Sequence, residues 1–379
     1  MDFTFTPEQE QLRDAIRRYL GQEYSFAARK AIIHGAGISE AAWRGFAEMG
    51  LLGVPVPEVH GGFGGNGVDR LVVMEEFGRG LVVEPFFATA ILGAACLRLA
   101  GSAQQQAAVL PGVADGTQKL ALALTETQSR HELFNVKASA TQAGEGWVLN
   151  GMKAVVLHGA QADRLIVAAR TGSTARDQNG LSLFMLERGA QGVSIFDYRT
   201  IDGMRAADIR FDDTRLGAGA LLGRAGDAWS VIRATAEIGI AALCAEAVGC
   251  MLALNEATLE YLKARQQFGV PIGRFQVLQH KAVEMFMETE QARSLALLAA
   301  VKVDSDDAAE RARTVHAAKA RVGRAAKFVG QTAIQLHGGM GMTDELPVGH
   351  YFKRLAMIEA TLGDTDHHLA AFANLADAA

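Results

Sequence analysis

The spacing of apolar residues changes twice along the chain and predicts a helical, then a β-rich, then again a helical region. After Pro7, which favours the first turn of a helix, Leu12, Ile16 and Leu20 follow at helical spacing. The glycine-rich run at 60–65 predicts a loop, because glycine weakens helices and strands alike. Further helices before residue 120 are predicted at 39–49, 68–79, 86–100 and 103–115.

The pattern of residues 121–225 is that of short strands rather than helices. Turn residues recur about every 8–12 positions, which is typical of a small β-barrel or β-sandwich. The pair Asn150-Gly151 predicts a hairpin turn, since these residue types favour the positive φ angles of tight turns. Strands are predicted at 147–149, 164–169, 181–186, 193–196 and 208–211.

Residues 227–379 return to long amphipathic helices with few prolines, which predicts a helix bundle. The order of elements therefore predicts an α+β fold that is mostly α and has three domains. The expected bounds are 1–120 for an N-terminal helical domain, 121–226 for a middle β-barrel or β-sandwich domain, and 227–379 for a C-terminal helical bundle.

The composition is that of a soluble globular protein, with 49% apolar and 21% charged residues among 379. A formal net charge of -5 and the lack of a lysine or arginine cluster argue against a nucleic-acid partner, whose phosphates require a basic face. The first residues lack the basic and apolar parts of a secretory signal. No uncharged apolar run reaches ~18 residues, so we expect no membrane span.

The cysteines are Cys96, Cys244 and Cys250, and none belongs to a Cys-x-x-Cys pair. Their odd number, wide spacing and apolar surroundings indicate reduced, buried thiols. Together with the lack of a secretory signal, this usage predicts a cytoplasmic protein, and we expect no metal site.

Three sequence blocks carry a resemblance to a known family. The most specific is Tyr261–Ile272, which contains the run Arg265-Gln266-Gln267-Phe268-Gly269 and is followed by Phe275-Gln276. The others are Trp43–Leu51, followed by Pro57-Glu58 and Gly61-Gly62, and Gln335–Gly341. On these blocks the chain resembles the acyl-CoA dehydrogenase family over nearly its whole length. The resemblance implies that family's fold, with a C-terminal four-helix bundle, and α,β-dehydrogenation of an acyl-CoA by FAD.

The resemblance also implies that residues of the C-terminal region bind the pyrophosphate and adenosine end of FAD. Arg265 suits this role because a guanidinium matches two phosphate oxygens at once, and glycine lets the backbone approach a ligand closely. Taken alone, the arginine run is also compatible with an ordinary helix end and a solvated arginine. In the family these groups reach into the flavin site of a neighbouring subunit, and here they are Arg265, Gln267, Phe268, Gln335, Gly338 and Gly339.

The flavin-ring end departs from the family pattern. Where the family has Thr-Glu-Pro followed by Gly-Ser-Asp, this chain keeps Thr125 and Glu126 but then loses the proline and carries Arg130-His131-Glu132. Where the family has x-Trp-Ile-Thr after a segment like Asn150–Lys153, this chain has Ala154–Leu157. The ring therefore loses an aromatic neighbour and a hydroxyl group together.

Apolar side chains at these positions cannot satisfy the polar edge of an isoalloxazine ring, and an unpaired buried polar atom costs ~1–3 kcal/mol. We expect Val155 and Leu157 to be packing residues instead. Two explanations stay open: a homo-oligomer that holds the flavin ring by weaker or rearranged contacts, or a domain that no longer holds a flavin ring. We favour the second.

The family's catalytic base is missing as well. Counted along the chain without gaps, the glutamate of one branch falls on Leu362 and that of the other branch near Gly239, and neither position has a carboxylate. Asp364 and Glu237 are the nearby candidates for a base, although Asp364 also suits a turn or a helix N-cap. The pair His367-His368 is expected on a solvated helix face.

The losses thus belong to a protomer's own active site, whereas the retained residues are those lent to a neighbour. This pattern resembles the small subunit of pimeloyl-CoA-type heteromeric acyl-CoA dehydrogenases. It implies an FAD-sharing, catalytically incomplete subunit that pairs with a complete large subunit, most simply as α2β2. The implied reaction converts an acyl-CoA to a trans-2-enoyl-CoA and passes electrons to an electron-transfer flavoprotein. The alternatives are a self-sufficient homotetramer that uses Asp364 or Glu237 as base, and a flavin-free scaffold that binds an acyl-CoA or a partner.

Overall fold

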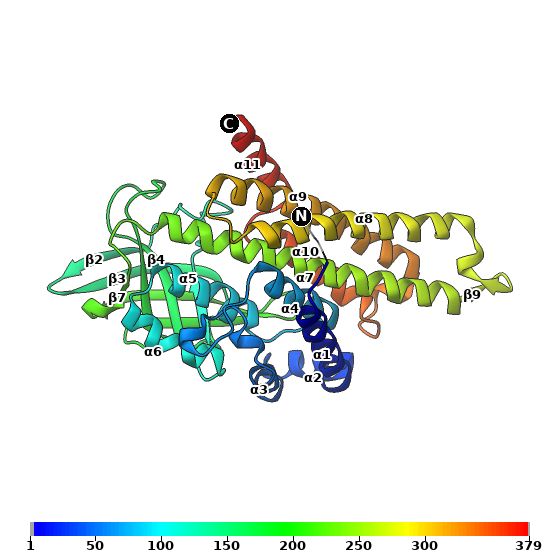
Figure 1. The fold of residues 1–379 in the computed structure, drawn as a ribbon, viewed down its shortest axis with the longest axis horizontal. Helices are drawn as coiled ribbons and strands as arrows, with labels where there is room; N and C mark the ends of the chain where they lie inside the picture. Colours follow the sequence, from blue (N-terminus) through cyan, green and yellow to red (C-terminus); the bar gives the residue numbers. More distant parts are fainter. Residues whose placement is uncertain (1–3, 378–379) are drawn as a thin grey trace. The chain divides into compact units, whose positions relative to one another are not determined.

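The structure, a computed structural model, describes residues 4–377, and its elements are drawn in Figure 1. Its contacts group into two compact units. The first unit holds the chain up to Ala31, then Asn66–Val82 and the chain from Ile240 on. The second unit holds Ile32–Gly65 and Val83–Gly239, so the long helix α7 (Trp229–Ala264) begins in the second unit and continues into the first.

The first unit starts with α1 (Pro7–Glu23), which begins where the sequence predicts. A capping box closes its first turn: the Thr6 side chain accepts a hydrogen bond from the Gln9 backbone N–H, and the Gln9 side chain accepts one from Thr6. α1 packs against α4 (Gly67–Gly80), whose first turn is closed in the same way by Asn66. The starts of these helices are thus set by local capping residues that can be recognised in the sequence.

The C-terminal helices of the first unit form the expected bundle. Gly78 of α4 lets the α7 backbone come close, because a Cβ there would lie 2.0 Å from the Glu246 carbonyl oxygen. Arg354 donates to both carboxylate oxygens of Glu246, at 2.6 and 2.7 Å, in a buried ion pair. At the centre, α9 (Ala308–His337) packs against α8 (Gln276–Lys302), α10 (Val348–Ala360) and α11 (Thr365–Asp377).

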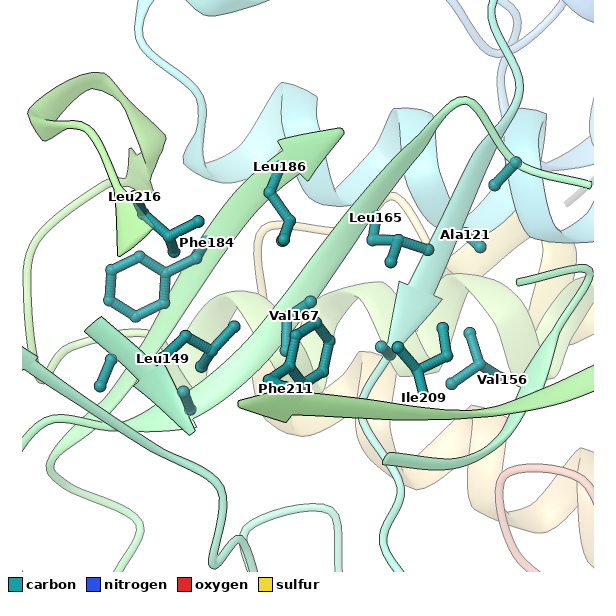
Figure 2. Close-up of a cluster of buried hydrophobic side chains, with 14 of the residues drawn as sticks. Ala121, Leu149, Val156, Leu165, Val167, Phe184, Leu186, Ile209, Phe211 and Leu216 are labelled. Atoms are coloured by element: carbon teal, nitrogen blue, oxygen red, sulfur yellow. The ribbon is translucent and has the colours of Figure 1, made fainter. Parts of the chain in front are cut away.

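The second unit is built on an eight-stranded mixed sheet with the order β6-β7-β3-β2-β4-β5-β8, and β1 lies parallel to β4. Figure 2 shows its core, in which Leu165 and Val167 of β4 and Phe184 of β5 gather with Ile209 and Phe211 of β7. All of these side chains are buried. The strands are β1 (Leu120–Ala123), β2 (Ser139–Ala143), β3 (Gly146–Leu157), β4 (Arg164–Arg170), β5 (Leu181–Glu187), β6 (Val193–Arg199), β7 (Arg205–Leu216) and β8 (Leu221–Leu222).

The predicted strands are present, but the prediction of a hairpin turn at Asn150-Gly151 is wrong. The pair lies inside β3, and the β2–β3 hairpin turns at Gly144 instead. A register shift against β7 between Leu149 and Gly151 marks a β-bulge. Asn150 and Asp213 of β7 stabilise this bulge, since each donates to the other at 3.0 and 2.8 Å. The dipeptide Asn150-Gly151, which favours turns, thus forms a β-bulge in this protein.

The helices of the second unit also lie where the pattern predicts them. One detail differs: the predicted helix at 86–100 starts with a π-helical segment, η3 (Phe87–Gly93), before it becomes α-helical. The α-helices are α3 (Glu40–Glu48), α5 (Ala94–Ala100) and α6 (Ala103–Ala114), while α2 (Phe26–His34) crosses from the first unit into the second. Short 3-10 turns are η1 (Leu51–Gly53), η2 (Glu58–His60), η4 (Ala218–Ala220), η5 (Ile272–Arg274) and η6 (Gly338–Met342).

Helix α7 is the most apolar long helix among residues 4–377. It is 36 residues long and includes an 18-residue window with a mean hydropathy of 1.8, which is enough to cross a membrane by length and composition. Inside the protein 89% of that window is buried, as is usual for the core helix of a folded domain. Cys244 and Cys250 lie on this helix, and both are buried free thiols, as is Cys96.

Candidate functional site

The arginine block lies directly after α7, in the first unit. The Arg265 backbone N–H donates to Tyr261 at 2.8 Å and ends the helix, and a hairpin of β9 (Gln266–Gln267) and β10 (Val270–Pro271) follows. Phe268 and Gly269 form its turn with φ angles of 54° and 76°. A left-handed phenylalanine is uncommon, and this one is 91% exposed, touching the edge of Phe275. The hairpin therefore presents an aromatic side chain to the outside.

The glycine block lies at the end of α9 and meets the arginine block. His337, the last residue of α9, stacks on Tyr261 with ring centroids 4.4 Å apart. Gly338 follows with a φ of 58°, and an added Cβ at Gly338 or Gly339 would meet nothing within 4 Å. The backbone here is open to close approach by a ligand, which is the property that a nucleotide-binding glycine needs.

The six implied FAD ligands are all exposed. Within residues 4–377, no hydrogen bond or ion pair engages the Arg265 guanidinium, and the Gln267 amide bonds only to its neighbour Gln266. Charged and polar groups exposed in this way are available to bind a ligand. The six exposed residues are Arg265, Gln267, Phe268, Gln335, Gly338 and Gly339. They fit the pyrophosphate and adenosine end of FAD.

At the ring end, in the second unit, the polar groups already have partners within the chain. The Thr125 hydroxyl donates to the Ala154 carbonyl oxygen at 2.5 Å, and the Ala154 N–H donates back to Thr125 at 2.9 Å. The buried Glu126 carboxylate lies 2.7 Å from the Lys153 ammonium and also accepts backbone hydrogen bonds from Lys137 and Ala138. These residues build the loop and offer little to a flavin.

The titration of this pair agrees with a structural role. Burial alone would raise the pKa of the Glu126 carboxyl, but the Lys153 charge and the hydrogen bonds outweigh it, so that the pKa lies below its ordinary value. Burial lowers the pKa of Lys153 to about 8, and Glu126 opposes this shift. The two groups therefore remain an ion pair near neutral pH, and neither is a free acid or base.

The segment that replaces x-Trp-Ile-Thr forms a second bulge of β3, with a register shift between Lys153 and Val156. Val155 has a φ of 55° and is 48% exposed, so the expectation that it is a packing residue is wrong, whereas the neighbouring Val156 is buried. The Val155 N–H donates to the Asp208 carboxylate at 3.0 Å, and the Tyr198 hydroxyl donates to the same oxygen at 2.9 Å. The bulge thus has a hydrogen-bond partner of its own and no polar side chain for a flavin ring.

The carboxylates of the two candidate bases, Asp364 and Glu237, each have a partner within the chain. The Asp364 carboxylate accepts a hydrogen bond from the His367 N–H at 2.9 Å, which makes it the N-cap of α11. Glu237 is buried on α7, with its carboxylate 3.8 Å from the Arg233 guanidinium. Leu362, on which the count along the sequence places the family's base, has a φ of 57° in the turn before α11.

A buried polar cluster that no sequence pattern predicted surrounds this turn. His368 is fully buried and lies 2.7 Å from His316 between ring nitrogens, so the expected solvated face is wrong for this residue. Lys319 is also fully buried, and its ammonium donates to backbone oxygens of the turn. A signal was available, because Lys319 falls among the apolar positions of α9 next to Val315 and Val322. No group of three metal-ligating side chains lies together anywhere in 4–377.

Comparison with known proteins gives the same family along the whole chain. The models of the acyl-CoA dehydrogenase N-terminal, middle and C-terminal domains match residues 6–117, 121–214 and 226–374. Probable acyl-CoA dehydrogenase YngJ of Bacillus subtilis (strain 168) is 30% identical over 373 residues, which cover 97% of each chain.

Solved structures agree with this family. The glutaryl-coenzyme A dehydrogenase glutaryl-CoA complex has a TM-score of 0.91 at 26% identity and covers 98% of this chain and 96% of its own. The steroid ACAD designated Tcur3481-Tcur3483 has a TM-score of 0.88 at 29% identity, with 98% of each chain covered.

Proposed function

Because the chain belongs to the acyl-CoA dehydrogenase family of FAD-dependent oxidoreductases, we propose that it is the FAD-sharing subunit of a heteromeric acyl-CoA dehydrogenase. Its partner is a catalytically complete large subunit, most simply in an α2β2 assembly. The resemblance to the small subunit of pimeloyl-CoA-type enzymes belongs to this proposal, as does a cytoplasmic location.

One contrast carries the proposal. The residues that would bind the nucleotide end of FAD are exposed: among residues 4–377 the Arg265 guanidinium has no hydrogen-bond or ion-pair partner, and the space beside Gly338 is open. The residues that would hold the ring are apolar, as Val155 and Leu157 are, or already hydrogen-bonded, as Thr125 is. A chain with this combination suits a flavin whose ring lies in another subunit.

The part played by this chain is therefore binding and orientation. Arg265 pairs with the pyrophosphate, Phe268 packs against the cofactor, and Gly338 lets the backbone approach the adenosine. Bound FAD supplies the hydride acceptor for dehydrogenation of an acyl-CoA to a trans-2-enoyl-CoA, and an electron-transfer flavoprotein takes the electrons onward. The base that removes the α-proton belongs to the large subunit.

A related solved structure supports a two-component enzyme. The steroid ACAD that is 29% identical to this chain carries a joint designation of two components, Tcur3481 and Tcur3483. A self-sufficient homotetramer remains the competing function, and the buried Glu237 carboxylate is the observation that favours it. A flavin-free scaffold is the third outcome that an experiment must separate.

The decisive measurement is the flavin content of the chain alone and with its large subunit. We expect the isolated chain to be nearly colourless and inactive on short, medium and long saturated acyl-CoAs. Co-expression with the large subunit should give about one FAD per heterodimer and dye-linked activity, because only one ring site in each pair is complete. About one FAD per protomer with turnover in the isolated chain would instead establish the homotetramer, and a colourless, inactive complex would indicate the scaffold.

A further inference from the structure

The turn between α10 and α11 has an unusual backbone. Leu362 has a φ of 57° and Gly363 a φ of 112°, both in the region that favours glycine. A side chain is excluded at Gly363, because a Cβ there would lie 2.5 Å from His368 Nε2 and 2.7 Å from His367 Cδ2. A leucine persists in such a conformation only where the surrounding structure determines it.

One of these determinants is Lys319 on α9. Its side chain is fully buried, and its ammonium donates to the Glu359 carbonyl oxygen at 3.0 Å and to the Gly363 carbonyl oxygen at 2.6 Å. These oxygens lie on either side of Leu362 in the sequence. A buried ammonium is costly, and a neutral donor would serve an ordinary turn at lower cost.

Glu359 fixes the same turn from the α10 side. One carboxylate oxygen accepts hydrogen bonds from the Thr365 N–H at 2.8 Å and the Thr365 hydroxyl at 2.6 Å. The other is buried, has no hydrogen-bond partner among the described residues, and lies against α9 at Gly323, where a Cβ would come within 2.0 Å of it. Glycine at 323 is therefore required for this carboxylate to reach its place.

His368 fixes the turn from the α11 side, and His316 of α9 contacts it. A carbonyl oxygen can only accept, so His368 Nε2 carries a proton and donates to Leu362 at 3.1 Å. His368 Nδ1 then accepts from His316 Nδ1 at 2.7 Å, and both rings are neutral. Burial, with a smaller contribution from His367, lowers the pKa of His316 to about 4. The histidines orient the turn without adding charge.

We propose that Lys319 is the positioning residue of a base-holding turn from which only the base is missing, so that an acid placed at position 362 would be fixed and held ionised. The inference rests on the proposed function in one respect, because the family resemblance identifies Leu362 as the base position. It goes further by assigning a role to Lys319. The chain would then have lost its base through one side chain while it kept the structure that holds it.

The charges around the turn support this role. Burial lowers the pKa of Lys319, and the Cys244 thiol, Glu359 and Asp364 oppose that shift. The acids that stabilise the charged form of Lys319 thus include one on each side of position 362. The titratable groups that face this region are Cys244 of α7, His316 and Lys319 of α9, Glu359 of α10, Asp364 of the turn, and His367 and His368 of α11.

A thiol at position 362 tests the proposal in the full chain without a flavin or a substrate. The variant is Leu362→Cys, and the probe is iodoacetamide alkylation against pH, read by mass spectrometry. Background reaction is low because Cys96, Cys244 and Cys250 are all buried, and the parent chain serves as the blank. We expect the alkylation midpoint to lie at least about one pH unit below that of the same variant in a Lys319→Met background. Lys319→Arg should preserve most of the difference.

Equal midpoints for Leu362→Cys with Lys319 present and with the Lys319→Met substitution added, in proteins that melt cooperatively, would overturn the proposal. Should Lys319→Met fail to fold, the Leu362→Cys chain alone decides. A midpoint at or above about 8.5, the ordinary thiol value, overturns the proposal, and a lower midpoint supports it. A merely structural role for Lys319 predicts a change in melting temperature but no effect on the thiol profile. Failure of the proposed function would appear separately, in the flavin content of the complex.

Discussion

His337 stacks on Tyr261, with ring centroids 4.4 Å apart and planes inclined by 28°. Tyr261 lies one turn before Arg265 at the end of α7, and His337 is the last residue of α9 before Gly338. His337 Nδ1 donates to the Ala333 carbonyl oxygen at 2.8 Å, and burial lowers its pKa, so the stack joins two neutral rings at neutral pH. This contact brings together the two sequence blocks that would bind one nucleotide.

Loss of the stack should loosen FAD in the heteromeric complex. Such ring pairs contribute ~0.5–1.5 kcal/mol beyond their buried area, so Tyr261→Leu should weaken FAD retention about 2–10-fold. The measurement is the dissociation constant of FAD from the purified complex, followed by flavin fluorescence. Tyr261→Phe keeps the stack and should retain FAD like the parent, and an equal loss in both variants would argue against the stack as the cause.

Arg265→Ala should weaken FAD retention more strongly. A charge-assisted contact to phosphate typically contributes ~1.5–3 kcal/mol, which corresponds to roughly 10–150-fold in affinity. Stability of the isolated chain should change little, because the guanidinium is exposed. Arg274, an exposed arginine at the end of η5, provides the matched control, and Arg274→Ala should leave FAD affinity unchanged. Full retention of FAD by Arg265→Ala would refute the proposal that Arg265 binds the FAD pyrophosphate.

The ring end can be tested by gain of function. Val155→Trp with Leu157→Thr restores the aromatic and hydroxyl groups that the family has at these positions, on a bulge whose backbone is already formed. One recovered hydrogen bond of ~1–1.5 kcal/mol should raise FAD affinity of the isolated chain about tenfold. The readout is absorbance near 450 nm per protomer after purification. Val155→Ala with Leu157→Ala should give no gain in FAD affinity. If this control gains as much as Val155→Trp with Leu157→Thr, the restored aromatic and hydroxyl groups are not the cause.

Asp364→Asn tests the competing homotetramer. Asparagine caps a helix about as well as aspartate, so the hydrogen bond to His367 and the stability of α11 should survive. Loss of a true general base lowers kcat by ~10²–10⁴, whereas we expect less than about a twofold change in the FAD-loaded complex. Glu237→Gln is to be measured beside it. A large drop in either variant with FAD still bound would place the base in this chain.

The His316–His368 contact predicts acid sensitivity of the first unit. Burial lowers the pKa of His316 to about 4 from an unfolded value near 6.5, so the unfolded chain binds more protons between these values. Stability should therefore be complete above pH 6.5 and fall as the pH drops toward 4, by about 3 kcal/mol at most from this residue. Urea unfolding at pH 7 and pH 5 measures the effect. His316→Phe should reduce the pH dependence, and His34→Gln at an exposed histidine should leave it unchanged.

Much of the fold could be predicted because its signals are local. Pro7 and Thr6 start α1 through contacts within a single turn, and short, nearly continuous apolar runs define β4 and β5. The residues proposed to bind the nucleotide could be named for the same reason, since Arg265 and Gly338 belong to short contiguous runs. The proposed role depends on residue type and exposure more than on distant neighbours.

Other features depended on contacts that no local pattern contains. Asn150-Gly151 favours a turn, but its partner Asp213 on β7 fixes it as a bulge. Val155 looks like a core residue, but the register against β7 turns it outward.

The sequence by itself determined the family and the order of helices and strands, because both depend on residue types at fixed spacing along the chain. Only the tertiary structure decided that Lys319, about forty residues before the turn, holds Gly363, since a buried ammonium finds its acceptors through the packing of α9 on α10 and α11. Helical period places Lys319 on an apolar face, but only the folded chain places carbonyl oxygens opposite it.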